Sequence, residues 1–74
     1  MPIIPTISDC TFIFLALGLF TCRCETVSGH GTNRSEAYRN MLDNFYDAHC
    51  EKLDSTEAWR FYRAIQSARF GVIR

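Results

Sequence analysis

"TFIFLALGLFTCRC", residues 11–24, is the stretch on which the fold of this chain depends. Residues 10–22 carry no charge and lie between Asp9 and Arg23. As a helix they would span about 20 Å, whereas the hydrocarbon core of a bilayer is about 30 Å thick. Extending the helix backwards would bring Asp9 into lipid at a cost of about 3 kcal/mol. A membrane-spanning helix is therefore not expected.

The same length suits the apolar region of an export signal, so residues 1–24 are also a candidate targeting segment of a secreted or membrane-attached peptide. However, "MPIIPTISD" (residues 1–9) contains no lysine or arginine for the positive leading region of such a signal. A match to a cleavage site, after Cys24, is weak. We therefore expect residues 1–24 to be an apolar N-terminal segment that packs as a helix or strand into the domain or against a partner, in a cytoplasmic protein.

The composition is that of one small folded domain. The chain has 74 residues, of which 47% are hydrophobic and 14% aromatic, which excludes a disordered chain. A chain this short buries only about 60% of its unfolded surface, so oligomerisation is an expected source of stability. Eight basic and eight acidic residues cancel, and no global field draws the chain to nucleic acid or an anionic membrane.

Two helices are predicted after residues 25–33, "ETVSGHGTN", which read as a linker because glycine, serine and threonine cluster there. The helices run from about 35 to 53 and from about 55 to 70. The short connection between them makes an antiparallel helical hairpin within residues 34–74. The predicted fold class is therefore all-α.

Helix-capping signals support both helices. Asn33 with Glu36, or Ser35 alone, is expected to cap the first helix, and Asp54 with Glu57 the second. Gly71 lies where a left-handed C-terminal cap belongs. The apolar face of the first helix consists of Tyr38, Met41, Leu42, Phe45, Tyr46, His49 and Leu53, and that of the second of Ala58, Phe61, Tyr62, Ile65 and Ala68.

The second helix carries a further stripe on its other side, at spacings i, i+4, i+7 and i+11. It consists of Trp59, Arg63, Gln66 and Phe70. Trp59 and Arg63 are close enough in sequence for a cation–π contact. Because tryptophan and arginine are enriched at binding hot spots, we predict a partner-binding site formed by Trp59, Arg63 and Phe70, with Arg60 at its edge. Either residues 11–22 cover this stripe, or a second subunit or another protein does.

No catalytic or metal-binding pattern is present. The candidate metal ligands are Cys22, Cys24, His30, His49 and Cys50. They lack the spacing usual in zinc-binding motifs, so neither a metal nor a cofactor is expected. The cysteines, including Cys10, are irregularly spaced and are expected to be free thiols. Without a nucleophile–base pair or a phosphate-binding loop, the chain is predicted not to be an enzyme.

These patterns favour a non-enzymatic protein–protein interaction or regulatory module, and we expect it to be oligomeric. A nucleic-acid binder is a weaker alternative: four arginines after residue 58 alternate with aromatics that suit base stacking, but five acidic residues between 43 and 57 oppose phosphate contacts. The short, helical, motif-free chain with its arginine–aromatic face resembles the accessory proteins of bacteriophages and other mobile elements. That resemblance is one of general style and transfers no residues.

Overall fold

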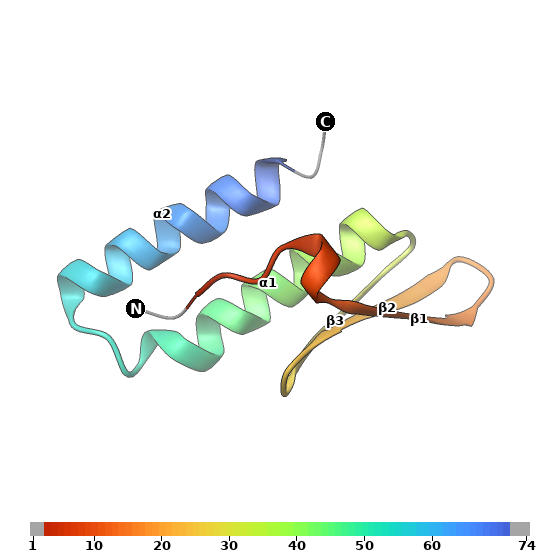
Figure 1. Ribbon diagram of the computed structural model, residues 1–74, viewed down its shortest axis with the longest axis horizontal. Helices are drawn as coiled ribbons and strands as arrows, with labels where there is room; N and C mark the ends of the chain where they lie inside the picture. Colours follow the sequence, from red (N-terminus) through yellow and green to blue (C-terminus); the bar gives the residue numbers. More distant parts are fainter. Residues whose placement is uncertain (1–2, 72–74) are drawn as a thin grey trace.

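The computed structural model describes residues 3–71 and has an α+β fold, so the all-α prediction is wrong. A three-stranded antiparallel sheet in the order β1-β2-β3 precedes two helices (Figure 1). The elements are the 3₁₀ turn η1 (Ile7–Asp9), β1 (Thr11–Ala16), β2 (Leu19–Cys24), β3 (Val27–Gly31), α1 (Arg34–Cys50) and α2 (Ser55–Gly71).

The apolar segment forms the β1–β2 hairpin. Ala16 pairs with Leu19 around a two-residue turn in which Gly18 takes a φ of 76°, a left-handed conformation that glycine adopts without steric cost. Phe12 pairs with Cys22, and Cys22 is fully buried beneath α1. A short apolar run does not by itself distinguish a strand from a buried helix. Its phenylalanine, isoleucine and threonine content suits a strand.

The predicted linker at 25–33 is largely strand β3. Val27, Gly29 and Gly31 are buried beneath α1, and the residues between them are exposed. A Cβ on Gly31 would lie 2.5 Å from the backbone nitrogen of Ala37, and one on Gly29 would collide with the backbone nitrogen of Met41. These glycines therefore mark the close approach of a helix to a strand, not a loop.

Two asparagines of α1 cover the outer edge of β3. The side-chain amide of Asn40 donates to the carbonyl of His30 at 2.5 Å, and that of Asn44 donates to the carbonyl of Ser28 at 2.7 Å. Carbonyl groups that would otherwise remain open at the edge of the sheet are thus paired, which blocks strand addition on this side.

The predicted caps are confirmed at both helix N-termini. Asn33 accepts from the Glu36 backbone N–H at 2.8 Å, which excludes Ser35 as the cap, and Asp54 accepts from the Glu57 N–H at 2.8 Å. Gly71 is the last residue of α2 and does not have the positive φ predicted for a left-handed cap.

The hydrophobic core lies between the sheet and α1 and continues between α1 and α2. Its buried members are Cys22, Val27, Ala37, Tyr38, Met41, Leu42, Phe45, Phe61 and Ile65. The predicted faces supply most of these residues. Tyr62 was predicted to face the core, but 42% of its surface is exposed to solvent.

The segment before η1 packs beside the helices. Pro5 is buried, and the Tyr38 hydroxyl donates to its carbonyl at 2.7 Å. Across residues 3–71, no helix combines the length and the apolar character needed to cross a membrane.

Candidate interaction surface

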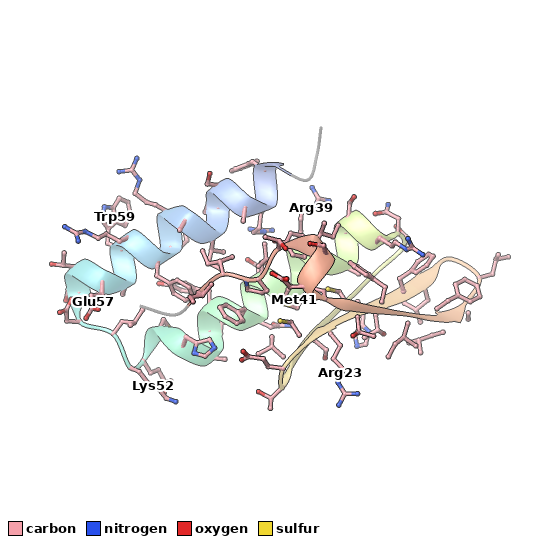
Figure 2. All side chains as sticks on the ribbon, viewed as in Figure 1. Arg23, Arg39, Met41, Lys52, Glu57 and Trp59 are labelled. Atoms are coloured by element: carbon pink, nitrogen blue, oxygen red, sulfur yellow. The ribbon has the colours of Figure 1, made fainter. Side chains whose placement is uncertain are left out.

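The exposed side of α2 carries the residues predicted to bind a partner. Trp59 is 59% exposed and Phe70 is 64% exposed, and Arg60 and Arg63 are exposed as well. Trp59 projects from α2 away from α1 (Figure 2). Residues 11–22 lie in the β1–β2 hairpin and leave these side chains uncovered, so of the two alternatives given for the stripe, cover by residues 11–22 is excluded.

Trp59 stacks on Tyr62, with ring centroids 6.0 Å apart and an interplanar angle of 14°. The cation–π contact predicted between Trp59 and Arg63 is not formed. Within the described residues, a cation–π contact joins Arg34 to the Phe12 ring instead, at 5.9 Å. The stack restricts the indole, and a side chain that is already restricted loses less conformational entropy on binding.

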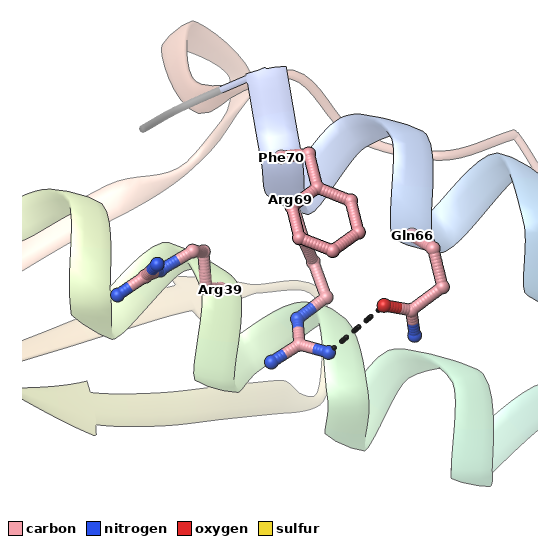
Figure 3. Close-up of a pocket in the computed structure, with 4 residues that line it drawn as sticks. All are labelled: Arg39, Gln66, Arg69 and Phe70. Carbon is pink, nitrogen blue, oxygen red and sulfur yellow. Dashed lines mark hydrogen bonds between the residues drawn. The ribbon is translucent and has the colours of Figure 1, made fainter. Parts of the chain in front are cut away.

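Two hollows lie along the junction of α1 and α2, the first of them beside Tyr62, and together they are called the groove. One hollow, beside Tyr62, is lined by Asp43, Tyr46, Asp47, Tyr62, Ile65 and Gln66. A second hollow of about 90 Å³ is lined by Arg39, Gln66, Arg69 and Phe70 (Figure 3). Gln66 belongs to both, so the two hollows adjoin one another.

Two arginines shape the end of the groove at Phe70. Arg69 donates to Gln66 Oε1 at 3.2 Å and forms an ion pair with Asp43 at 3.1 Å. Its Nε–H is buried and, within the described part of the chain, has no acceptor. Arg39 reaches the same hollow from α1, with its guanidinium turned away from that of Arg69 (Figure 3). This end of the groove offers hydrogen-bond donors to a carboxylate.

The predicted site residues are only partly brought together. With 100° of rotation per residue, Trp59, Gln66 and Phe70 lie within a narrow arc of α2 beside the groove. Arg63 points directly away from α1, and Arg60 lies on the side of α2 that is opposite to the groove. Sequence reasoning missed Tyr62, Arg69 and the α1 wall of the groove. The wall could not be found from the sequence because it depends on how the two helices pack.

Three thiols gather at the end of the sheet that receives η1. Burial, together with a hydrogen bond to Cys22 and the proximity of that thiol, raises the pKa of the Cys10 thiol to about 12. Burial also raises the pKa of Cys22 and of Cys24. Such thiols are poor nucleophiles near neutral pH because little thiolate is present. All four cysteines are free.

The candidate metal ligands are dispersed. His30 lies on the open face of the sheet, where its Nδ1 is 2.8 Å from the Thr21 hydroxyl, and the His49 ring packs 4.4 Å from that of Phe45. Between residues 3 and 71, no group of three or more His, Cys, Asp or Glu side chains is placed to hold a metal ion.

Comparisons with protein-family models, with curated proteins and with solved structures give no match.

Proposed function

We propose that this chain is a small, non-enzymatic protein-interaction module that binds a partner protein along the groove between α1 and α2. The single observation that carries the proposal is the Trp59–Tyr62 stack, which remains exposed at one end of a groove that has Phe70 at the other. Large aromatic side chains that are held rigid and yet exposed are typical anchors of binding hot spots.

The charges around the groove indicate the partner's chemistry. Arg39 and Arg69 line the Phe70 end of the groove, and Asp43 and Asp47 line the hollow beside Tyr62. An amphipathic helix fits this surface: its apolar residues would contact Trp59 and Phe70. A carboxylate at the Phe70 end would accept from Arg39.

The compartment is part of the same proposal. Four free cysteines suit a reducing cytoplasm. Residues 1–24 supply β1 and β2, including the fully buried Cys22, so their removal as a targeting segment would take away most of the sheet.

The test is site-specific crosslinking in the native host followed by binding measurements with the identified partner. A photoreactive amino acid at Tyr62 should capture the partner, and the same group at Ser28, exposed on the open face of the sheet, should not. With purified partner, Trp59→Ala and Phe70→Ala should each weaken binding about thirtyfold, the factor that corresponds to a hot-spot residue. Arg63→Glu should have a smaller effect, because Arg63 points away from the groove.

Arg23→Ala, an exposed arginine change on the sheet, serves as the matched control and should leave binding unchanged. Circular dichroism should show unaltered helicity in every variant. Equal capture from positions 62 and 28, or binding that survives both Trp59→Ala and Phe70→Ala, would overturn the proposal.

A further inference from the structure

Among the described residues, β1 is an edge of the sheet with unpaired backbone groups. The sheet order leaves β1 and β3 at its edges, and Asn40 and Asn44 cover the outer edge of β3. α1 packs mainly over β3 and β2, and its first residue, Arg34, lies over the Phe12 ring of β1. Within residues 3–71, no hydrogen bond joins Phe12 or Phe14 to a segment outside the sheet.

The register identifies the open backbone groups of β1. Cys24 pairs with Val27 across a two-residue turn, and the residues on either side of such a turn form a hydrogen-bonded pair. Because hydrogen-bonded pairs recur at every second residue of an antiparallel ladder, Cys22 and Phe20 also direct their backbone groups to β3. Thr21 and Arg23 must then bond to β1, through Ile13 and Thr11. The N–H and C=O groups of Phe12 and Phe14 therefore point away from the sheet.

This edge lacks charge and proline as protection against strand addition. Exposed edges are often protected by lysine, proline, inward-pointing charges or a β-bulge, and residues 10–22 contain no charge and no proline. The irregularity between Phe14 and Ala16 limits the regular stretch to Thr11–Phe14. The exposed side chains beside the edge are apolar: Ile13 is 38% exposed, Phe14 59% and Leu15 53%.

We propose that the β1 edge pairs with the β1 edge of a second copy of this chain, in antiparallel register about a two-fold axis at Ile13. Phe12 of one copy then faces Phe14 of the other, and each pair exchanges both backbone hydrogen bonds. The two sheets become one continuous sheet across the dimer.

Several features favour a second copy over an unrelated strand. The open groups of Phe12 and Phe14 are two residues apart, so a strand of the same sequence satisfies them by symmetry, and such two-fold contacts are the commonest in oligomers. No charge lies in the paired stretch, so two copies meet without repulsion. Ile13 meets its own counterpart with Cβ atoms about 5 Å apart.

The half-buried Phe12 ring also receives a neighbour in the exposed Phe14 of the other copy. Because only a short strand and a few side chains are buried, the interface is at the small end of specific contacts. We expect a reversible dimer with a dissociation constant on the order of micromolar.

The test uses the purified chain alone, so its result does not depend on the partner proposed for the α1–α2 groove. Molar mass is measured by light scattering and sedimentation across a range of concentrations. The native chain should shift from monomer to dimer. Ile13→Lys and Ile13→Glu should each remain monomeric, because like charges would face each other across the axis, and an equimolar mixture of the two should associate again.

Ile3→Lys is the matched control. It makes the same exchange at a side chain that is 90% exposed, in the segment that lies beside the helices rather than at the β1–β2 hairpin (Figure 1), and it should leave the dimer intact.

Amide hydrogen exchange reports on the strand pairing itself. The Phe12 and Phe14 N–H groups should become protected as concentration rises, whereas the Ile13 N–H, bonded to β2, should be protected throughout. A chain that stays monomeric at millimolar concentration would overturn the proposal. A dimer in which the Phe12 and Phe14 amides exchange freely, or an Ile13→Lys and Ile13→Glu mixture that does not associate, would overturn it as well.

Discussion

Gly29 lies so close beneath Met41 that a single methyl group on the strand would collide with the backbone of the helix. Together with Gly31 beneath Ala37, this contact brings α1 against β3 at a separation that only glycine permits. The same approach lets the short asparagine side chains of α1 reach the edge of β3. The position of α1, and through it of the α1–α2 groove, therefore depends on two glycines.

Gly29→Ala should lower the free energy of unfolding by about 3 kcal/mol, the upper part of the range for an overfilled core, because the atom struck belongs to the backbone and cannot rotate away. Urea denaturation followed by circular dichroism measures the change. Gly71→Ala is the control: its Cβ would enter open space within a helix, and it should be neutral or stabilising by less than about 1 kcal/mol. Equal effects at the two sites would contradict the close approach.

Asn44→Ala should destabilise the fold by about 1 kcal/mol, since it removes the bond to the Ser28 carbonyl at the edge of β3. Asn40→Ala should have a similar effect through the His30 carbonyl. Asp47→Ala, an exposed change on the same helix, should alter stability by less than about 0.5 kcal/mol. If all three variants unfold at the same urea concentration, the asparagine bonds do not stabilise the sheet edge.

Phe61→Ala should cost about 3–5 kcal/mol, because this fully buried side chain joins α2 to α1. Its ring lies 5.9 Å from that of Phe45 and 5.6 Å from that of Tyr46. Phe70→Ala removes the same side chain from a site that is 64% exposed and should change stability by less than about 0.5 kcal/mol. Thermal denaturation of the two variants separates the core phenylalanine from the surface one.

Stability should fall as the pH rises above about 9. Burial raises the pKa of Cys10 from 9.0 to about 12 and that of Tyr38 from 10.0 to about 12. The unfolded chain therefore loses these protons first, and the native state binds more protons than the unfolded state through this range. The stabilisation is complete below pH 9 and is lost as the pH approaches 12.

Urea midpoints measured between pH 7 and pH 11 test this expectation. The variant with Cys10→Ser and Tyr38→Phe combined should show a flatter decline at high pH than the native chain. An identical decline in the two proteins would assign the pH dependence to other groups.

Local signals in the sequence predicted the two helices well. Asn33 and Asp54 satisfy backbone N–H groups within their own first turns, so their roles depend on adjacent residues alone. The faces built on Met41, Leu42 and Phe61 followed from helical periodicity for the same reason. The exposure of Trp59 and Phe70 also agrees with the stripe read from residue spacing.

The sheet was missed because its signals depend on distant partners. Phe12 and Cys22 are apolar residues in an apolar run, and only their pairing shows that the run is a hairpin. Gly29 and Gly31 have the composition of a loop until a helix lies on them. Tyr62 follows the core-facing period of α2, yet the angle at which α2 meets α1 leaves it outside.

The sequence by itself determined the helices, their caps and an aromatic–arginine stripe on α2, since each of these arises from residues within a few positions of one another. Only the tertiary structure decided that residues 11–31 form a sheet, that a groove lies between α1 and α2, and that β1 remains open while β3 is covered. Strand pairing and helix packing bring together groups distant along the chain, and their free energy depends on which surfaces meet.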